Sequence, residues 1–185
     1  MRIKVSQQQV KQAFEAVKGG SMFEDSGALV AQGKMPLEMI QAFSLRPEIL
    51  RWFGQSGDAL YPGGLVERSV KEFIILESSR RNACQFCMNS HIDFTKSLGI
   101  ADDPLGALDE PARTERERLA IEYTRAAMTD SNRIPDSLFG RLRQHFSDPE
   151  IVELTAMIGF INMLNMFNNC LGVTYHGECA LPPAR

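Results

Sequence analysis

Residues 71–91 read KEFIILESSRRNACQFCMNSH, and this stretch contains the most informative motif of the chain. Cys84 and Cys87 form a C-x-x-C pair, and His91 follows the second cysteine by four residues. Two thiols at this spacing can close into a disulfide and reopen, and a histidine one helical turn further on can hold or remove a thiol proton. The same three groups are also three of the four ligands of a zinc site, so redox and metal-binding interpretations both stand at this point.

The motif is predicted to begin a helix that runs from about Ala83 to Leu98. Asn82 is a suitable N-cap residue, which would place Cys84 in the first helical turn. At about 100° per residue, the two cysteines, His91 and the apolar residues that follow lie within an arc of about 80° on one face. The helix dipole favours a thiolate most strongly at Cys84, whereas the spacing to the histidine favours Cys87. These arguments leave open which sulfur attacks.

Helical periodicity extends through the whole chain, and no stretch alternates convincingly with the period of a strand. The predicted fold class is therefore all-α, a bundle of about six to eight helices without a sheet. Capping-box patterns predict helix starts at Ser6 with Gln9, Thr114 with Glu117, and Ser147 with Glu150.

The clearest break in the chain is Tyr61-Pro62-Gly63-Gly64. A chain of 185 residues is most simply one domain. We therefore predict a single domain over residues 1–185, in which residues 1–62 form an amino-terminal helical extension and residues 65–173 form the motif-bearing core.

The composition is that of an ordinary soluble globular protein, with 44% hydrophobic and 23% charged residues. A net charge of −3 and a pI near 5.7 give no electrostatic footprint for nucleic acid or for an anionic membrane. The amino-terminal residues lack a signal-peptide core and no apolar run reaches about 20 residues, so we expect a cytoplasmic protein without membrane association. Four cysteines are too few for a disulfide-stapled scaffold, and Cys170 is predicted to be a small core residue.

A glutamate twelve residues before the first cysteine completes a recognisable pattern. Glu72, Cys84, Cys87 and His91 together resemble the motif of the AhpD-like alkylhydroperoxidases, a branch of the carboxymuconolactone decarboxylase family. The resemblance covers residues 65–173, including the apolar, asparagine-rich stretch SDPEIVELTAMIGFINMLNMFNN. On a helical wheel Glu72 lies off the apolar face and would by default be a solvated residue, and only the family spacing selects it over Glu77.

The resemblance implies a homo-oligomeric thiol peroxidase (a dimer, trimer or hexamer) with no cofactor and no metal. Cys87 would attack the hydroperoxide, Cys84 would resolve the sulfenic acid as a disulfide, and an external thiol reductant would reopen it. His91 would assist Cys87, and Glu72 would act in a proton relay. Gln85 and Phe86 stand between the cysteines, so a histidine that some relatives carry inside the C-x-x-C is missing.

Two other interpretations remain. A non-catalytic zinc-binding or assembly domain would take a fourth ligand from Cys170, His176 or Cys179. A decarboxylase like the family's namesake would use His91 and Glu72 as acid and base, although that branch generally lacks the paired cysteines. The asparagines of the last apolar helix need hydrogen-bond partners if they are buried, and we expect them to tie that helix to its neighbours.

Overall fold

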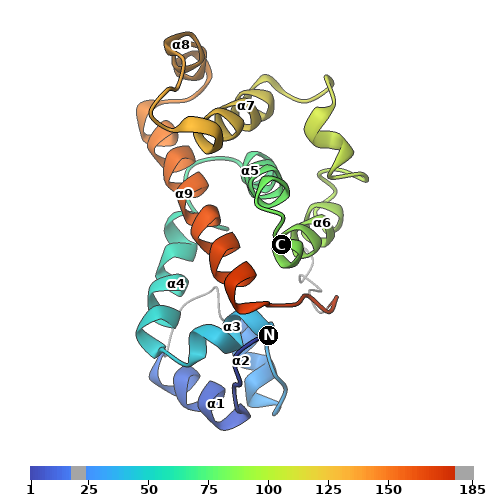
Figure 1. Ribbon diagram of the computed structural model, residues 1–185, viewed down its shortest axis with the longest axis vertical. Coiled ribbons are helices and arrows are strands. Elements are labelled where there is room, and N and C mark those ends of the chain that lie inside the picture. Colours follow the sequence, from blue (N-terminus) through green and yellow to red (C-terminus); the bar gives the residue numbers. More distant parts are fainter. Residues whose placement is uncertain (18–23, 178–185) are drawn as a thin grey trace. The chain divides into compact units, whose positions relative to one another are not determined.

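The computed structural model describes residues 1–17 and 24–177. Within these ranges the chain forms nine α-helices and a short 3₁₀ helix, and no strand (Figure 1). The prediction of an all-α fold is therefore confirmed, with one helix more than the upper estimate. The elements are α1 (Gln7–Ala16), α2 (Glu24–Ala31), α3 (Glu38–Ser44), α4 (Pro47–Ala59), α5 (Arg68–Arg81), α6 (Gln85–Ser97), η2 (Gly106–Asp109), α7 (Glu115–Asp130), α8 (Asp136–His145) and α9 (Asp148–Leu171).

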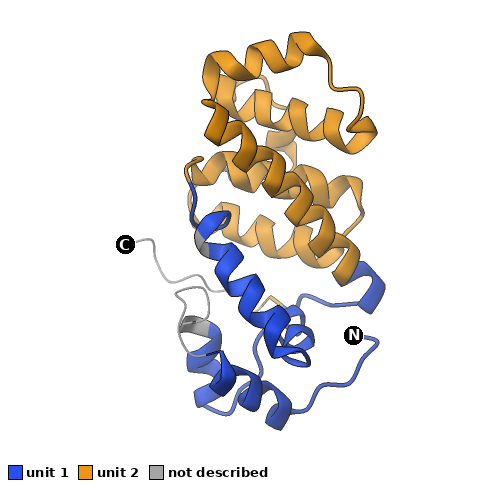
Figure 2. Ribbon diagram, turned by 90° about the vertical axis from the view of Figure 1, so that its left-hand side faces the viewer, with its two compact units in different colours: residues 1–64, 168–176 blue, residues 65–167, 177–185 orange. Residues whose placement is uncertain are grey.

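The chain divides into two compact units, coloured separately in Figure 2. The first unit contains residues 1–64 and 168–176, and the second is built on residues 65–167. The amino-terminal part of the first unit ends at Gly64, the last residue of the predicted Pro-Gly-Gly break. The end of α9 and the residues after it belong to the first unit, whereas the sequence grouped them with the motif-bearing core.

The first unit is a small set of helices in which α1 contacts α2, α3 and α4. Ser6 and Gln9 form the predicted capping box at the start of α1, and Pro47 occupies the first position of α4. The rings of Phe43 and Phe53 pack with their centroids 4.9 Å apart and join α3 to α4. Gly19 and Gly20, which follow this helix in the sequence, lie outside the described residues.

In the second unit α5 occupies the centre, with α6, α7 and α9 around it (Figure 1). Every residue from Val70 to Ser79 is buried, so α5 has no solvent face along most of its length. Three of these buried residues are charged: Lys71, Glu72 and Glu77. Because a buried charge is costly unless it is paired, the partners of these three residues define how α5 is held.

Lys71 pairs with Glu153 of α9, with Nζ and Oε1 2.6 Å apart. The Glu153 carboxylate also accepts hydrogen bonds from the backbone N–H groups of Leu65 (2.6 Å) and Val66 (3.0 Å). Burial opposes ionisation of Glu153, but these bonds outweigh it and lower the pKa of the carboxyl. Glu153 therefore attaches two segments to α9: the residues that precede α5, through their backbone, and α5 itself, through Lys71.

By length and composition α9 could cross a membrane, and it is the single helix of that kind in the described ranges. Its polar contacts are those of a core helix instead. Glu153 is paired with Lys71, and Asn165 is fully buried and hydrogen-bonded to Ser79 of α5. These contacts are those of a helix packed against the central helix of its unit.

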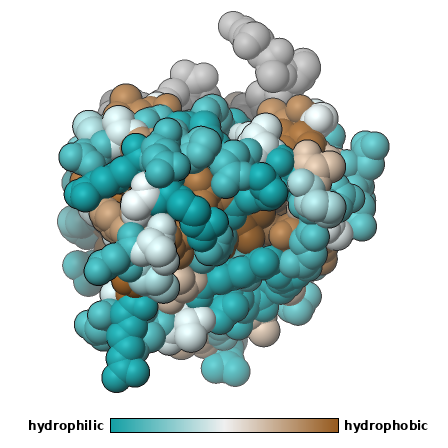
Figure 3. All heavy atoms as spheres, turned by 90° about the horizontal axis from the view of Figure 1, so that it is seen from above, coloured by the Kyte–Doolittle hydropathy of each residue, from teal (hydrophilic) through white to brown (hydrophobic). Residues whose placement is uncertain are grey.

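Two further helix starts agree with the capping patterns. Thr114 and Glu117 form a capping box at α7, and before α9 the Ser147 N–H and hydroxyl both donate to Glu150. These bonds, with one from Arg116, lower the pKa of Glu150 to about 2. The face over this end of the unit is mostly hydrophilic, with apolar groups visible between the charged side chains (Figure 3).

Candidate active site

The site is built on the turn between α5 and α6. Helix α5 ends at its C-cap Asn82, and Ala83 takes a left-handed conformation with φ of 50°. The Ala83 N–H donates to the Arg80 carbonyl (3.2 Å), and the Cys84 N–H donates to the Ser79 carbonyl (2.9 Å). This pair of bonds is a Schellman motif, in which an alanine occupies the position where glycine is usual.

The prediction that Asn82 caps the motif helix is wrong. Cys84 itself is the N-cap of α6, which begins at Gln85, so Cys87 lies in the first helical turn. The Asn82 side chain is engaged elsewhere, because its amide donates to Asn162 and Asn165 of α9. The partial positive charge of the helix start therefore acts on both cysteines, and it no longer singles out Cys84.

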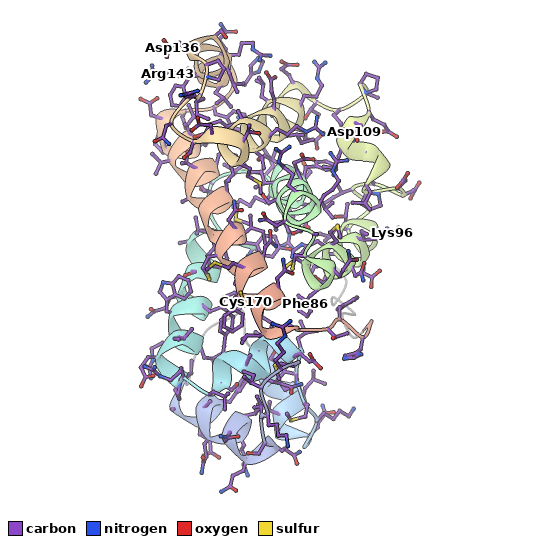
Figure 4. The ribbon with its side chains drawn as sticks, in the orientation of Figure 1. Phe86, Lys96, Asp109, Asp136, Arg143 and Cys170 are labelled. Atoms are coloured by element: carbon purple, nitrogen blue, oxygen red, sulfur yellow. The ribbon has the colours of Figure 1, made fainter. Side chains whose placement is uncertain are left out.

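The two sulfurs lie together at this helix start. Cys84 Sγ and Cys87 Sγ are 2.9 Å apart, within hydrogen-bonding distance for thiols. Cys84 is 0% and Cys87 4% exposed, and Phe86 between them is also buried at the start of α6 (Figure 4). The pair is therefore shielded from bulk water and close enough for a disulfide to form with a small movement.

The structure brings Glu72 and His91 together. Glu72 Oε2 lies 2.7 Å from His91 Nδ1. His91 follows Cys87 by four residues on α6, so this contact joins α5 to α6. Glu72 is 0% exposed, so the expectation from the helical wheel that this glutamate is solvated was wrong. The wheel assumed one apolar face, whereas α5 is covered on all sides.

The second oxygen of Glu72 has its own partner. Arg68, one turn earlier on α5, donates from Nε to Glu72 Oε1 at 2.6 Å. An ionised carboxylate in this position accepts a hydrogen bond from His91 Nδ1–H, which leaves Nε2 as the ring nitrogen that can take up a proton. The arrangement has the order of a catalytic base oriented by a buried carboxylate.

Comparisons with known proteins identify the fold. No protein-family model matches the chain. It is 28% identical over 151 residues to the uncharacterized protein YnjA of Escherichia coli (strain K12), covering 74% of this chain and 83% of that one. Among solved structures it matches the alkylhydroperoxidase AhpD core of an uncharacterized peroxidase-related protein from Ralstonia eutropha JMP134, with a TM-score of 0.74, 20% identity and coverage of 96% and 93%. The chain has the AhpD-like fold.

Two more solved structures resemble this chain. A protein of unknown function from Agrobacterium tumefaciens, described as a candidate antioxidant defence protein AhpD, is 29% identical, with a TM-score of 0.55 and coverage of 61% of this chain and 81% of that one. The debrominase Bmp8, solved with 2,3,4-tribromopyrrole, is 16% identical, with a TM-score of 0.67 and coverage of 85% and 87%. The AhpD-like fold thus leaves the substrate to be argued from the site.

The zinc interpretation needs a fourth ligand from Cys170, His176 or Cys179. Within residues 1–17 and 24–177, no three histidine, cysteine or acidic side chains are grouped as metal ligands. Cys170 is exposed, so the prediction that it is a core residue is wrong. His176 Nε2 lies 3.4 Å from Glu38 Oε1. Cys179, the remaining candidate ligand, lies outside the described residues.

Sequence reasoning missed two sets of residues at the site. Arg68 precedes Glu72 by four residues, and this i,i+4 spacing of opposite charges is a signal that could have found it. Ser79 and Asn165, which meet behind the turn, carry no comparable signal because they are 86 residues apart. Glu77 was the alternative to Glu72, and its carboxylate pairs with Arg80 and Arg125.

Proposed function

We propose that this protein is a thiol-dependent peroxidase that reduces hydroperoxides through the Cys84–Cys87 dithiol. The observation that carries the proposal is the pair of buried sulfurs 2.9 Å apart at a helix start, with His91 oriented by Glu72 on the next turn. A buried thiol pair beside a base and a helix dipole suits a cycle between dithiol and disulfide. The likeness to AhpD-like proteins supports the same reaction.

In the proposed cycle His91 removes the proton of Cys87, and the thiolate attacks one peroxide oxygen. An S–O bond forms and the O–O bond breaks, so the cysteine becomes a sulfenic acid while an alcohol leaves with a proton. The Cys84 sulfur then attacks the Cys87 sulfur, which forms the disulfide and releases water. An external dithiol supplies two electrons and two protons to restore both thiols. The assignment of Cys87 as the attacking residue follows the family resemblance.

A second part of the proposal is that the protein forms homo-oligomers. Helix α9 leaves a stripe of small and apolar residues exposed along one side, at the spacing of a helix face. Its members are Val152, Thr155, Ala156, Gly159 and Met166. A second copy would cover this stripe. A sedimentation mass of 20.7 kDa, that of one chain, would contradict it.

The reaction is tested by titrating free thiols during stoichiometric addition of hydrogen peroxide or an organic hydroperoxide. We expect two thiols lost for each peroxide, and a Cys84–Cys87 disulfide in the peptide mass map. Cys170→Ser is the matched control, because it removes an exposed thiol and should leave the stoichiometry of the pair unchanged.

The proposal fails if peroxide leaves both thiols of the pair titratable. An activity that survives replacement of both Cys84 and Cys87 by serine would point instead to acid–base chemistry by Glu72 and His91, as in the decarboxylase interpretation.

A further inference from the structure

We propose that a cluster of asparagines positions Cys84 for disulfide formation. The asparagine cluster is defined as Asn82, Asn162 and Asn165 together with the Ser79 hydroxyl, which accepts from Asn165. The inference rests on the proposed dithiol cycle and deepens it, because it names residues that control how readily the bond closes. They act through the backbone turn that precedes Cys84, so we treat them as positioning residues.

The cluster joins α9 to the end of α5 by side-chain amides. Asn82 Nδ2 donates one hydrogen to Asn162 Oδ1 (2.7 Å) and the other to Asn165 Oδ1 (3.0 Å). Asn165 Nδ2 donates in turn to Ser79 Oγ (3.0 Å), and Asn165 is 0% exposed. A fully buried amide is costly unless it is hydrogen-bonded, so these contacts form as a set and α9 cannot easily shift along α5.

The two residues that the cluster holds on α5 are those that define the turn before Cys84. Ser79 supplies the carbonyl that accepts the Cys84 N–H (2.9 Å), and Asn82 directly precedes the left-handed Ala83. An alanine is disfavoured in this conformation and keeps it only where its surroundings enforce it. The cluster holds the side chains of Ser79 and Asn82, both in the last turn before the strained residue, and so it provides that enforcement.

The strained turn determines where the Cys84 sulfur lies. Cys84 follows Ala83 directly and is the N-cap of α6, so its Cα position depends on the left-handed step. If the cluster is removed, the turn can relax and Cys84 Sγ moves from its place 2.9 Å from Cys87 Sγ. Disulfide formation must then restore the strained turn, which lowers the equilibrium constant for oxidation.

The test is the thiol–disulfide equilibrium of the purified full-length protein in glutathione buffers. One glutathione disulfide accepts two electrons and two protons from the pair, giving one Cys84–Cys87 bond and two glutathione thiols. We expect Asn165→Leu to lower this equilibrium constant about tenfold relative to the unchanged protein. The measurement uses no peroxide, so it can succeed even if the protein proves not to be a peroxidase.

Asn168→Leu is the matched control. Asn168 is on the same helix, 1% exposed and hydrogen-bonded to Met39, and so the same substitution removes a buried amide away from the turn. It should leave the glutathione equilibrium within about twofold of the unchanged protein, even if it lowers the melting temperature. Equal equilibrium constants for Asn165→Leu and Asn168→Leu would overturn the proposal.

Two further variants keep the test decisive if Asn165→Leu does not fold. Asn82→Ala removes the other end of the cluster at a half-buried position and should give a shift in the same direction. Ala83→Gly relieves the strain, because glycine adopts the left-handed conformation readily, and it should reduce the effect of Asn82→Ala when the two are combined. An unshifted equilibrium in Asn82→Ala, or full additivity of the two changes, would contradict the positioning role.

Discussion

Helix α5 buries two glutamates five residues apart, and their surroundings differ. Glu77 is surrounded by arginines: Arg80 Nη2 lies 2.5 Å and Arg125 Nε 3.1 Å from its carboxylate, and Arg81 approaches to 3.9 Å. Glu72 also has one arginine, Arg68, but its other oxygen lies 2.7 Å from His91. The Glu77 carboxylate thus contacts only arginines among these partners, whereas the Glu72 carboxylate contacts one arginine and one imidazole.

The difference separates a structural ion cluster from a site that can exchange a proton. Arginine stays protonated under all physiological conditions, so the charge around Glu77 is fixed. An imidazole can both accept and donate a proton through its ring nitrogens, so the pair of Glu72 and His91 is suited to proton exchange. Two identical residues on one buried helix therefore serve different purposes, and the type of partner distinguishes them.

The sharpest way to test this comparison is to make the same substitution at both positions. Glu72→Gln removes the carboxylate that orients His91, and we expect the rate of thiol loss with peroxide to fall about 100-fold. Glu77→Gln should change the rate per folded molecule less than threefold. Stopped-flow measurement of free thiols gives both rates, and equal losses in the two variants would show that the two glutamates do not differ in role.

The same pair of variants should differ in the opposite sense in stability. Glu77→Gln leaves several cations around an uncharged amide at a buried position, and we expect a loss of about 3 kcal/mol in the free energy of unfolding. Glu72→Gln should cost less, about 1 kcal/mol, because one arginine rather than three loses its anion. Urea unfolding curves measure both, and a larger loss in Glu72→Gln would reverse the interpretation.

A smaller effect is expected at the edge of the Glu77 cluster. Asp109, on η2 (Figure 4), accepts from Arg80 at 2.9 Å and from Arg125 at 2.6 Å, and these bonds lower its pKa below the usual 3.8. A lowered pKa means that the ionised form favours folding, so this stability is present above pH 3.8 and is lost as the pH falls below it. Asp109→Asn should therefore be less stable at pH 7 by under about 1 kcal/mol, since the side chain is mostly exposed.

Thermal unfolding at pH 7 and pH 3 measures the change at Asp109. The gap between Asp109→Asn and the unchanged protein should narrow at the lower pH. A gap of the same size at both pH values would show that the contacts of Asp109 with the two arginines do not contribute through its charge.

Local patterns in the sequence predicted the helices and several of their starts. The capping boxes at Ser6 and Thr114 depend on residues three apart, so they can be recognised without knowing the fold. The cysteine pair and His91 were found for the same reason. Glu72 needed the family spacing, because its burial depends on how many helices cover α5, and no local pattern records that number.

The start of α6 was mispredicted for a related reason. A glycine at position 83 would have marked the end of α5, but the chain carries alanine there, and so Asn82 was taken for the cap of the following helix. The contacts that hold the alanine come from α9, some 80 residues later in the chain. Long-range hydrogen bonds of this kind leave no periodic trace in the sequence.

The Schellman motif at the end of α5 has one further consequence, because its second hydrogen bond is made by the amide of Cys84 itself. The redox state of the sulfurs and the integrity of the last turn of the central helix are then thermodynamically linked. Linkage is reciprocal, so the intact turn favours the disulfide and the disulfide favours the intact turn by the same factor. Oxidation of the cysteine pair would thus reduce the fraying of α5 at its carboxyl end. The stability of the last turn of α5 would change each time the dithiol is oxidised or reduced.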